Sequence, residues 1–130
     1  MDQRTRQHVR QRAGHRCEYC QLAEAQSPVV KLQIEHILPR KHGGSDEPAN
    51  LALACIDCNL HKGANLTGID PDTGRVTELF NPRSRQWTEH FAWNGCLVAG
   101  LTAVGRTTIR VLDINAEDRV RVRLADASIA

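Results

Sequence analysis

Two Cys-x-x-Cys pairs, Cys17/Cys20 and Cys55/Cys58, constrain the fold of this chain more than any other feature. Thiolates three positions apart can point at one ion, and two such pairs supply the four ligands of a closed tetrahedral zinc site. The alternatives are unmetallated cysteines or a thioredoxin-like redox pair, but the latter belongs at the end of a strand in a strand–helix–strand pattern that this sequence lacks. We therefore expect a structural zinc ion that joins the two pairs.

Length and composition set modest limits on the fold. A chain of 130 residues forms one domain or a small domain with an extension. Aromatic residues make up only 4 %, so the core has to rely on aliphatic side chains and on the metal. The net charge of +2 neither requires nor excludes a nucleic-acid partner. Five arginines but only one acid occur before Cys17, so a polyanion would meet the front of the chain.

The sequence predicts a location without membrane contact. No apolar run is long enough to span a bilayer, and the polar, arginine-rich start is unlike a signal peptide. We expect a reducing, cytoplasmic environment of the bacterial type, where paired cysteines bind metals rather than form disulfides. The fifth cysteine, Cys96, lies in an apolar run and is expected to be a small buried hydrophobic residue.

The first half of the chain is predicted to alternate short elements around the cysteine pairs. Thr5 is a candidate helix cap, and Gly14 is a plausible helix stop. In order, we expect a helix over residues 4–13, a strand over 32–37, a polar loop over 38–49, a strand over 51–54 and a helix from Cys58 to near Asn65.

The second half has a different character. A dense cluster of turn residues over 68–74 precedes a segment over 76–80 that is a plausible strand. We then expect one or two helical turns around Trp87 and Phe91, a strand over 107–114, and a closing helix or strand over 116–127.

Polar residues of several chemical types lie between and just after the cysteine pairs. Glu35 and His36 form an acid–imidazole pair, and Asn50 precedes the second apolar strand. On an arbitrary strand, an adjacent acid and histidine are usually only a surface pair. Structural zinc alone does not need them, so their place between the two halves of a metal site makes them candidates for an active site.

The order of these motifs resembles that of the HNH endonuclease family, over roughly residues 4–66. The resemblance implies an α+β fold with a ββα-metal (His-Me finger) core, a structural zinc ion and a strand-containing C-terminal extension. It divides the chain into a nuclease core with a basic N-terminal helix at 1–66 and an extension at 67–130 that packs on the core and is not an independent domain. The motifs that carry it are Cys17-Glu18-Tyr19-Cys20, Glu35 to Pro39, Gly43-Gly44, Asn50 to Leu53 and Cys55 to Gly63.

The resemblance also assigns roles to residues of the core. His36 would be the general base, because imidazole titrates near neutral pH and can take a proton from water. Glu35 and Asn59 would hold a divalent cation, which offsets charge on the phosphate and on the leaving oxygen. Asn50 would brace the loop that carries the histidine. Lys62, together with Arg40 and Lys41, would contact DNA phosphates.

Asn59 stands where many members of the family carry a further histidine. Carboxylate and amide oxygens favour Mg²⁺ or Mn²⁺ over softer ions. His61 is the alternative ligand, but helix positions 59 and 61 point about 200° apart and cannot both face one ion. We favour Asn59.

Two functions follow from this sequence. The first is a metal-dependent endonuclease that hydrolyses phosphodiester bonds in DNA with low sequence selectivity, supported by the intact set of Glu35, His36, Asn50 and Asn59. The second is a zinc-knuckle nucleic-acid-binding module without catalysis. No residue pattern specifies an oligomeric state.

Overall fold

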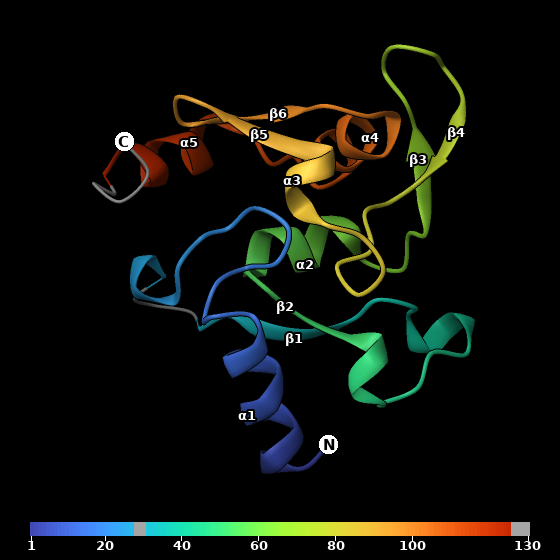
Figure 1. The fold of residues 1–130 in the computed structure, drawn as a ribbon, viewed down its shortest axis with the longest axis vertical. Coiled ribbons are helices and arrows are strands. Elements are labelled where there is room, and N and C mark those ends of the chain that lie inside the picture. Colours follow the sequence, from blue (N-terminus) through green and yellow to red (C-terminus); the bar gives the residue numbers. More distant parts are fainter. Residues whose placement is uncertain (28–30, 126–130) are drawn as a thin grey trace.

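The computed structural model describes residues 1–27 and 31–125, and within them it contains three separate two-stranded antiparallel sheets with helices between them (Figure 1). The N-terminal half consists of α1 (Gln3–Arg12), β1 (Gln33–His36), β2 (Leu51–Ala54) and α2 (Ile56–Lys62). Strands β1 and β2 pair antiparallel, with His36 opposite Leu51. The β1–β2–α2 unit confirms the mixed α+β fold expected from the sequence.

Helix α1 begins one residue earlier than expected and has a different cap. The side chain of Asp2, not Thr5, caps the helix by accepting a hydrogen bond from the Thr5 amide at 2.8 Å. An aspartate at this position satisfies one of the free amides of the first turn. Val9 is the buried residue of this otherwise polar helix and joins the core.

The loop between β1 and β2 is more ordered than a plain polar loop. It contains two 3₁₀ turns, η2 (Arg40–His42) and η3 (Pro48–Asn50), separated by the Gly43-Gly44 turn. Gly43 has a φ of 88°, a left-handed conformation that glycine adopts without steric cost. A third 3₁₀ turn, η1 (Glu24–Gln26), follows the first cysteine pair.

The C-terminal half contains two hairpins and three helices among the described residues. Its elements are β3 (Thr67–Ile69), β4 (Val76–Glu78), α3 (Trp87–His90), β5 (Phe91–Asn94), β6 (Leu97–Gly100), α4 (Ala103–Val111) and α5 (Glu117–Leu124). The closing element is thus a helix, and residues 126–127 of its expected range lie outside the described residues. Cys96 lies in the turn between β5 and β6 and is only half-buried, so the expectation of a fully buried residue is wrong.

The expected strand over residues 107–114 is also wrong, because most of this segment belongs to helix α4. Its β-branched residues favour a strand locally. However, the Thr102 side chain caps the helix by accepting a hydrogen bond from the Gly105 amide at 3.1 Å. Val104, Thr107 and Thr108 then lie on one buried helical face. The Thr108 hydroxyl satisfies its own hydrogen bond within the helix by donating to the Val104 carbonyl at 2.7 Å.

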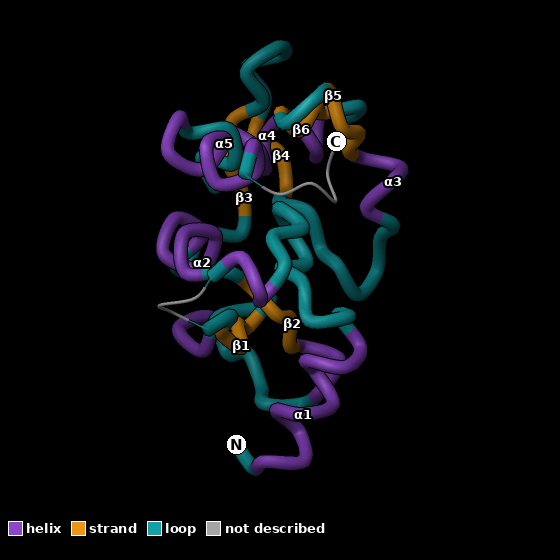
Figure 2. Tube along the Cα trace, turned by 90° about the vertical axis from the view of Figure 1, so that its left-hand side faces the viewer, coloured by secondary structure: helices purple, strands orange, loops and turns teal. Residues whose placement is uncertain are grey.

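The two halves share one hydrophobic core. Figure 2 shows α1, β1 and β2 at one end of the molecule, α4, α5, β5 and β6 at the other, and α2 between them. Tyr19 makes an edge-to-face contact with Phe80, and Phe80 makes another with Phe91. The Trp87 indole donates to the Tyr19 carbonyl at 2.8 Å. These contacts join side chains of the two halves in one core. The expectation that the C-terminal extension is not an independent domain stays a prediction. None of the described helices has the length and apolar character needed to cross a bilayer.

Candidate active site and four-cysteine cluster

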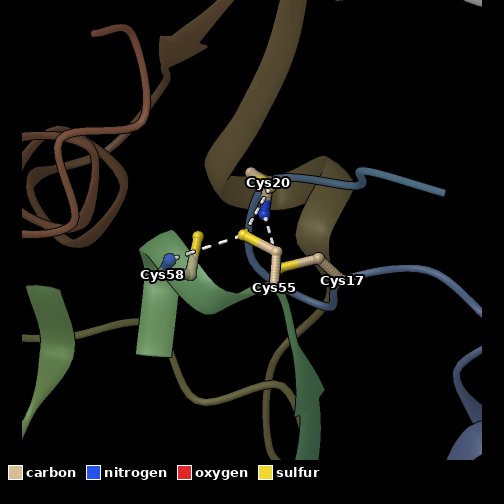
Figure 3. Close-up of side chains that lie close together, drawn as sticks. All are labelled: Cys17, Cys20, Cys55 and Cys58. Atoms are coloured by element: carbon tan, nitrogen blue, oxygen red, sulfur yellow. Dashed lines mark hydrogen bonds between the residues drawn. The ribbon is translucent and has the colours of Figure 1, made fainter. Parts of the chain in front are cut away.

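The two cysteine pairs meet at the start of α2. Cys55 caps this helix, and its sulfur accepts a hydrogen bond from the Cys58 amide at 3.4 Å. In the first pair, the Cys17 sulfur accepts from the Cys20 amide at 3.5 Å. Each pair is thus a tight turn with both sulfurs on the same side. Figure 3 shows the four side chains converging from the first turn and from the N-terminal end of α2.

The cluster has the dimensions of a zinc site. Its four sulfur atoms lie within 4.8 Å of one another, and all four residues are buried. A regular tetrahedron with zinc–sulfur distances of about 2.3 Å has edges of about 3.8 Å. The Cys20 and Cys55 sulfurs are 3.7 Å apart. The four cysteines therefore fit a structural zinc ion with a closed coordination shell.

A buried arginine from the C-terminal half donates hydrogen bonds to the sulfurs of this cluster. Arg119 on α5 donates from Nη2 to the Cys58 sulfur at 2.9 Å and approaches the Cys55 sulfur at 3.7 Å. Its Nη1 donates to the carbonyls of Leu112 and Asp113 at 2.5 and 3.0 Å. Four thiolates around Zn²⁺ leave a net negative charge, which this guanidinium offsets. The sequence analysis missed Arg119, because nothing in the local pattern of α5 indicates what its arginines face.

Strand β1 places Glu35 and His36 on opposite faces, as the alternation of a strand requires. His36 faces the loop, where its Nε2 lies 2.7 Å from Oδ1 of Asp46. Arg40 binds the same carboxylate through Nη2, at 2.9 and 3.1 Å from the two oxygens. The hydrogen bond from His36, followed by that from Arg40, lowers the pKa of Asp46. The sequence analysis had not singled out Asp46.

Asn50 holds the ends of this loop together. Its Oδ1 accepts from the Leu38 amide at 2.8 Å, and its Nδ2 donates to the carbonyls of Leu38 and Ser45 at 3.0 and 2.8 Å. Gly44 lies against this brace, since a Cβ there would be 1.6 Å from the Leu38 oxygen and 2.9 Å from Asn50 Nδ2. Asn50 thus links the segment after β1 to Ser45, next to the Gly43-Gly44 turn, and its role in catalysis stays a prediction.

Glu35 faces the interior and is already paired. Only 4 % of it is exposed; Tyr19 donates its hydroxyl to Oε2 at 2.8 Å, and the Lys62 ammonium lies 2.5 Å from Oε1. Burial raises the pKa of Glu35, while the nearby Lys62 acts in the opposite direction. A divalent cation at Glu35 would have to compete with this ammonium.

Lys62 corrects one expectation of the sequence analysis. Its side chain is 3 % exposed, and besides Glu35 it donates to the carbonyls of His36 and Ile37 at 3.3 and 3.0 Å. A buried, fully engaged ammonium does not reach a phosphate on the surface. Lys62 instead ties the end of α2 to the end of β1, beside the candidate active site.

The two candidate ligands on α2 differ in their surroundings. Asn59 is half-buried, and its Nδ2 donates to Oε1 of Gln33 on β1 at 2.7 Å. His61 is exposed. Asn59 thus faces the strand that carries Glu35, although its amide is bound to Gln33 rather than shared with the carboxylate.

Basic side chains surround the exposed side of His36. A hollow of about 410 Å³ is lined by His36 together with Arg6 and Arg10 of α1 and Arg40 of η2. Arg10 is held by Glu24 at 3.2 Å, whereas Arg6 is exposed. Lys41 is exposed next to Arg40 in η2. The hollow therefore combines an imidazole with cationic groups that suit a phosphate ester.

The HNH endonuclease family model matches residues 17–65. This range contains both cysteine pairs, β1, β2 and α2, and it leaves out α1 and the C-terminal half. No curated protein and no solved structure matches the chain. The family match confirms, over residues 17–65, the resemblance inferred from the order of the motifs.

Proposed function

We propose that this protein is a metal-dependent endonuclease that hydrolyses phosphodiester bonds in DNA, because residues 17–65 match the HNH endonuclease family model. The observation that carries the proposal is the place of His36, which borders a hollow lined by Arg6, Arg10 and Arg40. A histidine beside three guanidinium groups is suited to deprotonate water next to a bound phosphate.

In this proposal, His36 is the general base. The neutral imidazole takes one proton from a water molecule, the water oxygen attacks phosphorus, and the bond from phosphorus to the leaving oxygen breaks. The leaving oxygen takes a proton from solvent, and the imidazolium returns its proton to solvent. The arginines of the hollow bind the non-bridging oxygens and offset the charge that builds up on them. Asn50 keeps the loop in shape, so that the partners of His36 stay in place.

Glu35 and Asn59 are the proposed holders of a divalent cation. Their carboxylate and amide oxygens suit Mg²⁺ or Mn²⁺. When bound, such a cation supplies positive charge at the phosphate and the leaving oxygen. The Lys62 ammonium at Glu35 would have to yield for the cation to bind, so we expect a requirement for millimolar rather than trace concentrations of the metal.

DNA binding in this proposal is mainly electrostatic. Arg6, Arg10, Arg40 and Lys41 contact phosphates around the hollow, and phosphate contacts carry no base information. The ββα unit is too small to read many base edges. We therefore propose low sequence selectivity and an affinity that falls with salt.

The alternative is a zinc-dependent nucleic-acid-binding module without catalysis. The pairing of Glu35 with Lys62 favours it, because an internal ammonium already neutralises the carboxylate that a catalytic cation would need. In this case the basic hollow would bind phosphates without cleaving them.

A plasmid-nicking assay separates the two functions. Wild-type protein is expected to convert supercoiled DNA to nicked DNA with Mg²⁺ or Mn²⁺, and not when these ions are omitted. His36→Ala is expected to lower the rate by about 10²–10⁴-fold, the usual contribution of a general base. Zinc content and DNA affinity should be unchanged in this variant.

The matched control is His8→Ala, which removes an exposed histidine of α1 that does not line the hollow. It should cleave at the wild-type rate. Equal rates for wild type and His36→Ala would remove His36 as the base. Wild-type protein that binds DNA but does not nick it with either ion would support the binding module instead.

A further inference from the structure

We infer that Asp46 is a positioning residue that holds the hydrogen of His36 on Nε2 and so leaves Nδ1 as the nitrogen that accepts a proton. This inference rests on the proposed role of His36 as a base. The juxtaposition that carries it is a cluster of His36 on β1, Arg40 on η2 and Asp46 in the loop that follows the Gly43-Gly44 turn.

The hydrogen-bond partners of the ring decide its tautomer. The Nε2 atom of His36 lies 2.7 Å from Oδ1 of Asp46. An ionised carboxylate can only accept a hydrogen bond, so the ring nitrogen has to be the donor. The lowered pKa of Asp46 keeps this carboxylate ionised at neutral pH. Nε2 therefore carries the hydrogen of the neutral ring.

Arg40 also approaches this nitrogen, with its Nε 3.4 Å from His36 Nε2 in the geometry of a long hydrogen bond donated to the ring. The contact of Nε2 with the Asp46 carboxylate is much shorter, at 2.7 Å, so Asp46 rather than Arg40 sets the tautomer. The guanidinium makes its own shorter bonds to Asp46, at 2.9 and 3.1 Å. The carboxylate thus accepts hydrogen bonds from both side chains at once.

The loop itself holds Asp46 in place. The carbonyl of the preceding residue, Ser45, accepts a hydrogen bond from Asn50 at 2.8 Å, and the Ser45 hydroxyl accepts from the amide of Glu47 at 3.2 Å. The brace made by Asn50 therefore fixes the backbone next to Asp46 as well as the segment after β1. Through this contact Asn50 acts on the tautomer of His36.

The chemical consequence concerns the second ring nitrogen. Among residues 1–27 and 31–125, Nδ1 of His36 has no hydrogen-bond partner, so its lone pair is free in the neutral ring. A carboxylate behind a histidine also stabilises the imidazolium that forms when the ring takes a proton, as in hydrolytic triads. Asp46 would thus help His36 without touching water or phosphate.

Proton NMR of the free protein, with ¹⁵N-labelled histidine, tests the tautomer without any cleavage assay. In wild type, His36 should show a slowly exchanging, downfield Hε2 proton bonded to Nε2. This signal should be lost in Asp46→Ala and should persist in Glu47→Ala, which removes the neighbouring exposed acid. It should also persist in Arg40→Ala, because the bond from His36 to Asp46 remains. Absence of the signal in wild type, or its persistence in Asp46→Ala, would overturn the inference.

Cleavage kinetics then measure what the tautomer contributes. Asp46→Ala should lower kcat by about 10- to 100-fold with little change in KM, less than the loss of the base itself. Asp46→Glu should restore part of kcat. An equal loss in Glu47→Ala, or a change in KM alone, would count against positioning. If wild type shows the Hε2 signal but does not cleave DNA, the proposed function fails while the tautomer assignment holds.

Discussion

The four-cysteine cluster and the His36 hollow are built on the same β1–β2–α2 unit, yet they are opposite kinds of site. All four sulfurs of the cluster are buried and converge on one point, which leaves no open position for a substrate. His36 instead borders a hollow lined by arginines, and its partner Asp46 is exposed. The closed site is suited to hold the fold, and the open one is suited to chemistry.

Both sites place a cation beside negatively charged groups, but with different consequences. At the cluster, Arg119 comes from the distant helix α5 and is buried against Cys58. At the hollow, Arg40 comes from the same loop as Asp46 and its side chain is 66 % exposed. A buried, long-range contact constrains the packing of the two halves, whereas an exposed local one is free to exchange Asp46 for a phosphate.

Loss of a zinc ligand should have the largest effect on the closed site. Wild-type protein is expected to bind about one zinc ion per chain, and Cys58→Ser should abolish stoichiometric zinc and cooperative unfolding. The reason is that metal binding and folding are coupled when the ligands come from distant parts of the chain. Elemental analysis together with a thermal melt followed by circular dichroism measures both.

The control for this change is Cys96→Ser, which alters the half-buried cysteine outside the cluster. It should keep the zinc and the melting temperature close to those of wild type. Soluble, cooperatively folding protein without zinc would break the distinction between a closed structural site and an open chemical one.

Removal of Arg119 should have an intermediate effect. Arg119→Ala deletes the hydrogen bonds to the Cys58 sulfur and the buried positive charge, so zinc should be held less tightly. Residues that support metal ligands typically contribute about 10–100-fold in affinity. Competition with a chromogenic chelator, which reports the release of zinc, measures this change.

Arg121→Ala is the matched control, because Arg121 lies on the same helix but is exposed and pairs with Glu117 at 2.7 Å. Zinc affinity should not change in this variant. Equal zinc affinity in Arg119→Ala would mean that α5 covers the cluster without stabilising it. The packing of the C-terminal half on the cluster would then rest on other contacts, such as the hydrogen bond from Trp87 to the Tyr19 carbonyl.

The closed site could be predicted from the sequence far more fully than its surroundings. The spacing within Cys17/Cys20 and Cys55/Cys58 fixes local turns whose sulfurs face one ion, so the cluster follows from short-range geometry. Strands β1 and β2 were also expected over nearly the observed ranges, because they too follow from short-range sequence patterns. Arg119 could not be anticipated, because its partner sulfurs are far away in the sequence and only the packing of α5 brings them together.

The open site shows where local patterns are insufficient. The sequence indicated His36 and Asn50, but it placed Lys62 on the surface. A lysine near the end of a helix is usually exposed. Here Glu35 faces the interior and needs a counter-ion, which draws the Lys62 side chain inward. The strand expected over residues 107–114 failed in a related way, since the burial of one helical face outweighed the strand preference of its β-branched residues.

The smallest expected effect concerns a single phosphate contact at the edge of the open site. Arg6 is exposed and lines the hollow, so Arg6→Ala should weaken binding of a short DNA duplex about equally for unrelated sequences. Loss of one phosphate contact should also reduce the slope of log affinity against log salt by about one unit. Fluorescence anisotropy at several salt concentrations measures both quantities.

Arg4→Ala removes the same charge from an exposed position on α1 that does not line the hollow, and its slope should stay at the wild-type value. Equal slopes for the two variants would show that the whole helix, rather than the hollow beside His36, attracts the polyanion. The proposal that the open site positions the phosphate would then be wrong.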